Sequence, residues 1–503
     1  MKNTFRVTIF ILAIIALLYV IKDYLGGWMI GAISALFSLS VLFIAILIFL
    51  ENRHPTRTLT WLVVLGSFPL LGFIFYFLFG RNVRKQRLFK QKALLDKQTA
   101  ERIIGERTYS KEEMTILGEE RKSLFKLSKN LGGSPISFAT ETEVLTDGDQ
   151  AFSRIIEQLE KANHHIHLEY YIVRHDGLGN QIKDVLIRKA KEGVIVRFLY
   201  DAVGSWKLSK KYIKDLKEAG VQIIPFSPVR MPIFNNKINF RNHRKIIVID
   251  GNIGFVGGLN IGDEYLGKDE YFGFWRDTHL YVKGKAVRSL QLIFLQDWYY
   301  MTEESLLSPE YLSPSLTEQK QHGGVQMIAG GPDQEWEVIK NLFFTMITSA
   351  KKSIWIASPY FIPDDDIFSA LKVAALSGID VRLLIPNRPD KKIVFYASRS
   401  YFPELMEAGV KIYEYEKGFL HSKVIIVDGE VASIGTANMD MRSFHLNFEV
   451  NAFLYNTNSL RKLVEDYEVD ILHSQPIVKE VFANRPIYQR VMESLCRLTS
   501  PLL

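Results

Sequence analysis

Hydrophobic residues are crowded into the first eighty positions of this chain, in three runs that hold no charged side chain. The runs cover residues 7–21, 24–50 and 58–80, and they are 15, 27 and 23 residues long. A helix needs about 20 apolar residues to cross a hydrocarbon layer of about 30 Å, so the second and third runs are long enough. The first run is shorter, but Arg6 and Lys22 at its ends can reach the interface and let it cross as well.

The first run has two other interpretations. A signal peptide would end in a small-x-small cleavage site, and residues 19–24 offer none, so we expect a retained anchor. A helix buried in a soluble core would also fit a run of this length. We predict a transmembrane module over residues 1–80, with spans near residues 5–22, 28–50 and 59–79.

Basic residues follow the third run directly and predict the orientation of the chain. The cluster contains no acid and consists of Arg81, Arg84, Lys85, Arg87, Lys90 and Lys92. The loop before that run carries only two arginines, Arg53 and Arg57. Because basic residues mark the cytoplasmic ends of spans, residues 81–503 are predicted to be cytoplasmic, in a multi-pass protein of a cell membrane. The cluster is also expected to bind anionic lipid, although a solvated basic helix would have the same composition.

The rest of the chain repeats itself. The matched segments are 166–173 with 354–361, 193–199 with 378–384, 218–223 with 407–412, and 242–251 with 420–429. The change in spacing predicts an insertion of about eleven residues in the first copy, within residues 226–241. Strands alternate with helices in both copies, which predicts layered α/β structure with a largely parallel sheet. We therefore expect a pseudo-twofold pair of α/β/α lobes.

Composition sets the remaining boundaries and narrows the class of protein. We expect a basic juxtamembrane linker over residues 81–135, lobes over 136–305 and 324–503, and a serine- and proline-containing linker over 306–323. Hydrophobic residues are 48% and charged residues 23%, which are ordinary globular values. The net charge of +7 suits an anionic partner, either a phospholipid surface or a nucleic acid. The single cysteine, Cys496, excludes an internal disulfide and a thiolate zinc site, and we expect it to pack in the core.

A His-x-Lys motif occurs once in each copy of the repeat. Residues i and i+2 of a strand face the same side, so His243 projects with Lys245, and His421 projects with Lys423. Two such pairs suit a phosphodiester. One neutral imidazole can attack phosphorus while the other, protonated, gives its proton to the leaving alkoxide. The lysines would hold the non-bridging oxygens, and this chemistry needs no metal or other cofactor.

Each motif continues into an Asp-Gly pair and then into a segment of small residues. Asp250 and Asp428 stand where the strand is expected to turn, and both a turn-capping role and a direct catalytic role remain open. Asn260 and Asn438 end the small-residue segments, and their amides can donate to a phosphate oxygen.

Each catalytic imidazole also needs a carboxylate that orients it. Asp277 and Glu449 are the best candidates, 34 and 28 residues after the histidine of their own copy. His164, His165 and His167 look like a metal cluster, but they straddle the start of a strand and are expected to be structural.

The duplicated His-x-Lys-x4-Asp motif resembles that of the phospholipase D superfamily. The flanking segments are similar to those of bacterial cardiolipin synthases, notably residues 51–61, 69–72, 76–82, 258–265, 274–279, 294–298 and 438–450. The resemblance extends from about residue 28 to the end, and the run at 7–21 is an addition to the usual pair of spans. It implies that one phosphatidylglycerol gives its phosphatidyl group to a histidine and releases glycerol, after which a second phosphatidylglycerol attacks and yields cardiolipin. Family preference makes His243 the nucleophile and His421 the acid and base.

Other reactions and partners fit parts of this pattern. The same site could hydrolyse phospholipid or transfer the phosphatidyl group to serine. A nuclease would use the basic run Lys207, Lys210, Lys211, Lys214 and Lys217, but its spacing is also that of a solvated helix face, and no nucleic acid is expected as a partner. A lipid-binding scaffold without activity is disfavoured because both copies retain the His, Lys and Asn residues.

Overall fold

The computed structural model describes residues 134–228, 239–312 and 322–503, together with shorter stretches and single positions between residues 31 and 131. The chain divides into two units, Met1–Lys85 and Gln86–Leu503. In the first unit α3 (Pro55–Ser67) buries Leu65 against Val41, Ile44 and Trp61. Within the described part of the chain, no helix is long and apolar enough to cross a membrane. The predicted span at 5–22 lies outside the described residues, and those at 28–50 and 59–79 lie only partly inside them.

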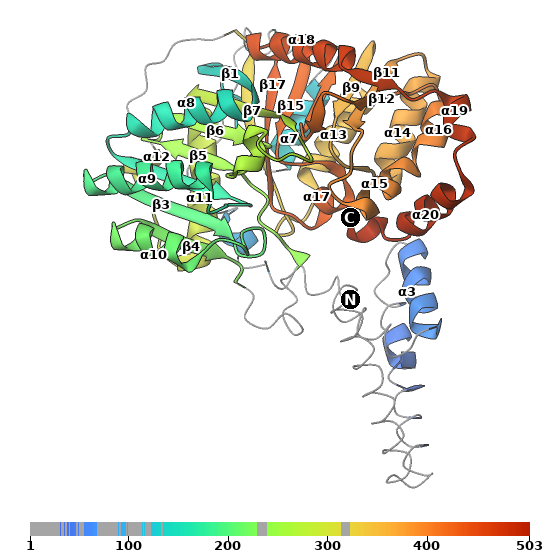
Figure 1. Cartoon of the computed structure of the whole chain (residues 1–503), viewed down its shortest axis with the longest axis horizontal. Coiled ribbons are helices and arrows are strands. Elements are labelled where there is room, and N and C mark those ends of the chain that lie inside the picture. Colours follow the sequence, from blue (N-terminus) through green and yellow to red (C-terminus); the bar gives the residue numbers. More distant parts are fainter. Residues whose placement is uncertain are drawn as a thin grey trace. The chain divides into compact units, whose positions relative to one another are not determined.

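The second unit is a mixed α/β structure with two large sheets (Figure 1). The first sheet has the strand order β1 (Thr140–Asp147), β7 (Phe274–Gly284), β6 (Ile253–Gly257), β5 (Ile246–Ile249), β2 (His165–Tyr170), β3 (Ile195–Asp201) and β4 (Gln222–Phe226). Its helices are α8 (Gly148–Glu160), α9 (Gly177–Lys191), α10 (Lys210–Glu218), α11 (Val287–Thr302) and α12 (Pro309–Leu312), with a 3₁₀ turn at Asp263–Leu266.

The second sheet repeats that order and adds one strand at its edge. It runs β8 (Gly324–Gly330), β17 (Glu449–Tyr455), β15 (Val431–Gly435), β14 (Val424–Val427), β9 (Ser353–Ala357), β11 (Asp380–Pro386), β12 (Lys411–Tyr415) and β18 (Ser474–Pro476). Its helices are α13 (Val338–Thr348), α14 (Asp365–Leu376), α15 (Lys392–Arg399), α16 (Phe402–Glu407), α17 (Met441–His445), α18 (Asn458–Leu472), α19 (Lys479–Ala483) and α20 (Ile487–Arg497). The second half also holds a small pair of strands, β10 (Phe361–Ile362) and β16 (Met439–Asp440), and a 3₁₀ turn at Ser500–Leu502. The helix α7 (Lys122–Asn130) precedes both sheets in the chain.

The sheets are mixed, whereas the sequence predicted largely parallel ones. Among the described strands, β2, β3 and β4 of the first sheet pair in parallel, as do β9, β11 and β12 of the second. A strand of the second half, β13 (Gly418–Leu420), also adds to β7 in parallel, and the other pairings within the two sheets are antiparallel. The Asp-Gly turns explain the difference, because each joins two neighbouring strands, β5 to β6 and β14 to β15, as an antiparallel hairpin.

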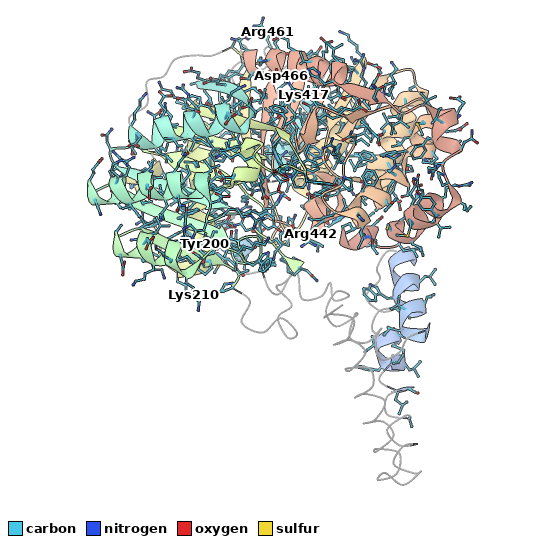
Figure 2. The ribbon with its side chains drawn as sticks, viewed as in Figure 1. Tyr200, Lys210, Lys417, Arg442, Arg461 and Asp466 are labelled. Atoms are coloured by element: carbon cyan, nitrogen blue, oxygen red, sulfur yellow. The ribbon has the colours of Figure 1, made fainter. Side chains whose placement is uncertain are left out.

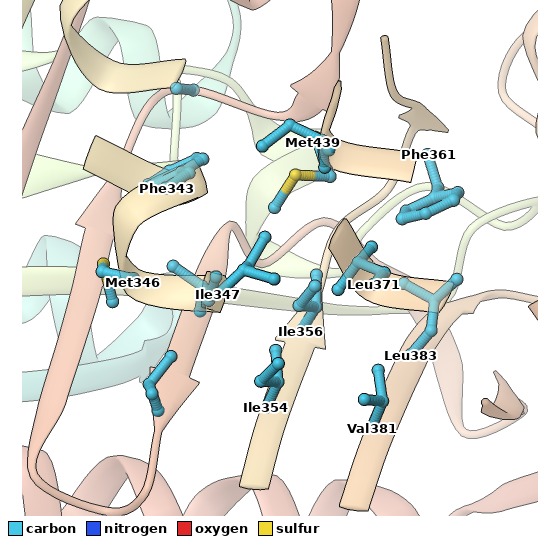
Figure 3. Packing of buried hydrophobic residues seen from close by; sticks show 14 of the residues in the cluster. Phe343, Met346, Ile347, Ile354, Ile356, Phe361, Leu371, Val381, Leu383 and Met439 are labelled. Carbon is cyan, nitrogen blue, oxygen red and sulfur yellow. The ribbon is translucent and has the colours of Figure 1, made fainter. Parts of the chain in front are cut away.

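The apolar core lies in layers on both faces of each sheet. In β5, Ile247 and Ile249 pack towards the helices of the first half, whereas Ile246 and Val248 join a cluster that the two halves share. The strand β14 alternates in the same way, so Ile426 reaches the shared cluster. Figure 3 shows the outer layer of the second half, where Phe343 of α13 and Leu371 of α14 cover Ile354 and Ile356. The inner faces of the two sheets therefore pack against each other.

Two segments that the sequence assigned to linkers contact the core. Lys92 is 4% exposed, and its Nζ lies 2.8 Å from a carboxylate oxygen of Asp333 and 3.2 Å from one of Asp297. It therefore does not belong to a lipid-facing basic cluster. In the predicted 306–323 linker, Tyr311 and Leu312 are buried with Leu306. Most of the segment predicted to contain the insertion, residues 226–241, lies outside the described residues.

Candidate active site

Main-chain pairing between the two halves brings the motifs together. The amide of His243 donates to the carbonyl of Phe448 at 2.9 Å, and the amide of Phe448 donates to the carbonyl of Arg241 at 2.9 Å. In the other direction, β13 (Gly418–Leu420) adds to β7 of the first sheet, and the amide of His421 donates to the carbonyl of Arg276 at 2.7 Å. Each histidine is thus placed beside the strand of the opposite half.

This exchange decides which carboxylate orients which imidazole. The Nδ1 of His243 lies 2.9 Å from Oε2 of Glu449, and the Nδ1 of His421 lies 2.6 Å from Oδ2 of Asp277. The two carboxylates chosen from the sequence do contact the histidines, but the assignment of each to the histidine of its own copy is wrong. The pairs cross between halves because Phe448 and Arg276, which bond to the histidine amides, directly precede Glu449 and Asp277.

The lysines occupy the same buried space as the histidines. Lys245 is fully buried and donates to the carbonyl of His243 at 2.7 Å. Lys423 is 3% exposed, donates to the carbonyl of His421 at 2.5 Å, and places its Nζ 3.2 Å from Nε2 of that imidazole. The prediction that each His-x-Lys motif projects to one side is confirmed.

Burial is the largest influence on the protonation of the imidazoles. It lowers the pKa of His243 well below its usual value, and the charges of Lys245, Lys423 and His421 add to the effect. Burial and Lys423 lower the pKa of His421 to about 4, against the opposing charge of Asp277. Both rings are therefore neutral near pH 7 in the absence of an anion.

The lysines and carboxylates are perturbed by the same burial. It lowers the pKa of Lys245 to about 7 and that of Lys423 to about 8, although nearby carboxylates oppose the change. Burial also raises the pKa of Glu449 to about 7. Burial acts in the same direction on Asp277, but Lys423 and His421 outweigh it and hold the pKa of that carboxyl below its usual value. Because burial disfavours the charged form of the two lysines, a negatively charged substrate would stabilise them as cations. The site is therefore suited to an anionic substrate.

The two asparagines are buried and already make local hydrogen bonds. The Nδ2 of Asn260 lies 3.1 Å from the hydroxyl of Tyr265, and its Oδ1 accepts from the amide of Ile172 at 3.1 Å. The Nδ2 of Asn438 donates to Asp440 at 3.1 Å. Each amide nitrogen has a second proton, so both side chains retain a donor for a phosphate oxygen.

Asp250 and Asp428 are not brought together with the histidines. The Asp250 carboxylate accepts from the amides of Asn163, His164 and His165 at 2.8–2.9 Å, and Asp428 accepts from the amides of residues 351–353. Both aspartates have positive φ, 52° and 56°, as the turn requires. Asp250 follows His243 by seven positions, and β5 lies between them, so the two residues are separated by roughly 20 Å at the usual rise of a strand. Of the two roles left open by the sequence, this geometry favours the turn.

The other groups noted in the sequence have structural surroundings. His165 and His167 are fully buried beside Tyr311, and within the described ranges no cluster of three or more potential metal ligands occurs. The lysines of α10 are exposed while Tyr212 and Leu216 of that helix are buried, and Figure 2 shows Lys210 at the edge of the body. Cys496 is buried, as predicted.

Aromatic and amide side chains beside the imidazoles were missed from the sequence. The ring of Tyr171 meets that of His243 edge to face with centroids 4.9 Å apart, and the ring of Trp275 lies 5.1 Å from that of His421. Trp275 precedes Asp277 by two residues and its Nε1 lies 3.5 Å from the carboxylate, while Asn447 precedes Glu449 by two and donates to it at 3.1 Å. Asp277 and Glu449 had already been chosen from the sequence. The residues two positions before them, Trp275 and Asn447, are expected on the same side of an extended segment, so this spacing could have identified both.

Comparison with known proteins places this site in a family. A family profile described as "Cardiolipin synthase, PLD-like domain" matches residues 155–298 and 343–471, and one described as "Phospholipase_D-nuclease N-terminal" matches residues 38–81. The chain is 68% identical, over the full length of both proteins, to a cardiolipin synthase of Geobacillus sp. strain WCH70. It is 65% identical to cardiolipin synthase 2 of Bacillus anthracis, with 93% of this chain and 91% of that protein covered.

A solved structure supports the same fold. The phosphatidylserine synthase of Haemophilus influenzae superposes with a TM-score of 0.58, covering 76% of this chain and 100% of that one, at 15% identity. At that identity the likeness concerns the fold alone. The two profile matches, the full-length relatives and the duplicated His-x-Lys site together establish that the chain belongs to the cardiolipin synthases of the phospholipase D type.

Proposed function

We propose that the protein joins two molecules of phosphatidylglycerol into cardiolipin and glycerol through a phosphatidyl-histidine intermediate. The observation that carries the proposal is the crossed arrangement of two His–Lys–carboxylate sets around one buried space. Two displacements at one phosphorus need one group that forms the covalent intermediate and another that moves a proton in both steps. The full-length relatives named as cardiolipin synthases supply the identity of the lipids.

In the first step, His243 attacks the phosphorus of the donor lipid. Its Nδ1–H group donates a hydrogen bond to Glu449, and this tautomer leaves the lone pair on Nε2 free to form the new N–P bond. The P–O bond to glycerol breaks, and His421 gives its proton to the departing oxygen. The phosphodiester anion raises the low pKa of His421 when it binds, so that the proton is present when it is needed.

In the second step, the terminal hydroxyl of another phosphatidylglycerol attacks the same phosphorus. His421 removes the hydroxyl proton, the N–P bond breaks, and His243 returns to its starting state. Lys245, Lys423 and the amides of Asn260 and Asn438 hold the non-bridging oxygens, where negative charge increases in the transition state. Asp250 and Asp428 take no part in these steps and stabilise the turns after the motif strands.

The acceptor is a lipid, so the catalytic unit must work at a bilayer. We assign residues 1–80 to a transmembrane module with spans near 5–22, 28–50 and 59–79, and place residues 81–503 in the cytoplasm. The matched segment at residues 38–81 and the apolar runs support this assignment. We divide the catalytic unit into lobes at residues 136–305 and 324–503, and the matching strand orders support that division.

Product analysis with isotope-labelled phosphatidylglycerol tests the reaction. The purified protein should form one cardiolipin and one glycerol from two lipids, and added glycerol should reverse the reaction. In His421→Ala, mass spectrometry of the quenched protein should find a phosphatidyl group on His243. The exposed His473→Gln is the matched control and should behave as wild type. If an adduct formed on His421 in the His243→Ala variant and none formed on His243 in the His421→Ala variant, the roles of the two histidines would be exchanged. Phosphatidate as the main product would refute the transferase assignment.

A further inference from the structure

Apolar side chains form a stripe along α20, near the carboxyl end of the chain. Its members are Ile487, Tyr488, Val491, Met492, Leu495 and Leu498, each between 40% and 75% exposed. Their spacing of one, three and four residues places them along one side of the helix. We call this surface the α20 stripe. Val478 and Val481 in and before α19 add two further exposed apolar side chains.

The stripe is not the side by which α20 packs on the protein. Glu493 and Cys496 are buried on the opposite side, and α20 contacts α15. The carboxylate of Glu493 accepts from Nε of Arg485 at 2.9 Å and from a terminal nitrogen of Arg485 at 2.5 Å. The helix is thus fixed by one side while its apolar side remains uncovered by the described residues.

The charges on α20 select the kind of surface that would cover the stripe. Glu493 is the only acidic residue of the helix, and it is 2% exposed and paired. Arg490 is exposed within the stripe's length, whereas Arg497 at the end of the helix is partly exposed and its side chain lies 3.6 Å from the carboxylate of Glu404. An apolar stripe that has the exposed Arg490 beside it and no exposed acid on the helix itself complements an anionic lipid surface. A second copy of the same stripe would face it with the same positive charges.

The stripe also lies on the side of the catalytic unit that carries the active site. Lys391, directly before α15, is close enough for its charge to contribute to the low pKa of His243. After α20, the chain ends at Leu503, whose carbonyl accepts from the amide of Arg442 in α17 at 2.8 Å. The N-cap residue of α17 is Asp440, whose carboxylate accepts the hydrogen bond from the side-chain amide of Asn438. In Figure 1, α17, α20 and the carboxyl end share one edge of the catalytic unit, and α18 runs along the opposite edge.

We propose that the α20 stripe lies in the headgroup region of an anionic phospholipid bilayer and holds the active site against the lipids on which it acts. This inference rests on the proposed function, because only a lipid-processing site gains from such a contact. Amphipathic helices with a basic polar side bind membranes in this orientation, with their apolar side buried at the boundary between headgroups and acyl chains.

Depth-dependent fluorescence quenching on the full chain tests the contact. In a Cys496→Ala background, a single bimane probe is attached at Leu495→Cys in α20 or, as the matched control, at Leu472→Cys in α18, where the wild-type leucine is 82% exposed. The protein is reconstituted in vesicles of phosphatidylcholine and phosphatidylglycerol that contain brominated acyl chains. We expect strong quenching at position 495 and little at position 472. Equal quenching at the two positions, or none at 495, would overturn the proposal.

A second copy or the amino-terminal module could cover the stripe instead. Either occupant would shield the probe at position 495 from brominated lipid, and energy transfer between differently labelled chains would identify the second copy. Both outcomes refute a lipid contact.

Activity measurements separate the contact from the chemistry. Leu495→Glu places an acid in the stripe, and we expect the surface density of phosphatidylglycerol at half-maximal rate to rise about tenfold while kcat is unchanged. Leu472→Glu should have no effect, and short-chain phosphatidylglycerol dissolved as monomers should be converted equally by both variants. No change for Leu495→Glu would refute the proposal. Absence of cardiolipin from wild type would instead refute the proposed function.

Discussion

Replacing Asp250 by alanine should destabilise the first half of the catalytic unit and leave its chemistry intact. The carboxylate accepts three backbone N–H groups, from Asn163, His164 and His165, at 2.8–2.9 Å. A hydrogen bond contributes about 0.5–1.5 kcal/mol net, so three contribute about 2–4 kcal/mol, and partial exposure favours the lower end. Alanine at a φ of 52° adds about 1 kcal/mol of backbone strain.

The effect can be divided by a series of variants. Asp250→Gly removes the three bonds but tolerates the positive φ, so it should be less destabilising than Asp250→Ala by about 1 kcal/mol. Asp250→Asn keeps one oxygen acceptor and should lie closest to wild type. The exposed Asp149→Ala in the first turn of α8 serves as the matched control and should change stability by only a few tenths of a kcal/mol.

Thermal unfolding and single-turnover kinetics measure the two consequences separately. We expect the Tm of Asp250→Ala to fall by about 4–10 °C. The rate per folded molecule should stay within about twofold, since His243, Lys245 and Glu449 keep their contacts. If Asp250→Asn kept its Tm and lost activity 100-fold, the aspartate would belong to the chemistry and the turn assignment would be wrong.

Four further predictions concern the site, its support and its orientation. Glu449→Gln and Asp277→Asn should each lower kcat by about 100-fold or more with little change in Tm, because each leaves an imidazole without its carboxylate; near wild-type rates would remove them from the site. Lys245 and Lys423, whose pKa values are about 7 and about 8, bind phosphate only when protonated. The value of kcat/KM should therefore fall as the pH rises through that range, and a constant kcat/KM up to about pH 10 would show that their charge is not needed for catalysis. Lys92→Met should cost about 3–5 kcal/mol, because it removes the cation that pairs with the buried carboxylates of Asp333 and Asp297, although Arg244 still pairs with Asp297; the exposed Lys126→Met should cost almost nothing in the same unfolding assay. Protease added to intact cells should spare residues 86–503; cleavage there from outside would reverse the predicted orientation.

The local geometry of each His-x-Lys motif was predictable from the sequence, because it follows from the spacing of residues within an extended segment. His243 projects with Lys245, and His421 with Lys423, since residues two apart share a side. The crossing of the carboxylates was not predictable, because the number of residues between a histidine and a carboxylate does not show which of the two histidines the carboxylate contacts. The crossing depends on the pairing of β13 with β7 and of Asn242 with Phe448, which joins residues about 140 to 200 positions apart.

The burial of Lys92 was missed for a similar reason. In the sequence it ends a basic cluster beside an apolar run, and such clusters usually face lipid. Its actual partners, Asp297 and Asp333, come from α11 and from the loop after β8, which no local pattern connects to residue 92. Asp297 also pairs with Arg244, which donates from Nε to the carbonyl of Glu449 at 3.1 Å. The segment that holds Lys92 is thereby connected to the residue that orients His243.

The crossing of the two pairs has a consequence for how such a protein can arise and change. A half on its own holds a histidine and a carboxylate that belong to different pairs, so it would complete a site only by meeting a second half across a twofold axis. A single-copy ancestor would therefore have been active as a homodimer, with both pairs identical by symmetry. Fusion of two copies into one chain removes that constraint, and the pairs here have already diverged: one uses glutamate supported by Asn447, the other aspartate supported by Trp275. The two halves of this chain thus hold their imidazoles in different surroundings, so each imidazole can be adjusted independently of the other.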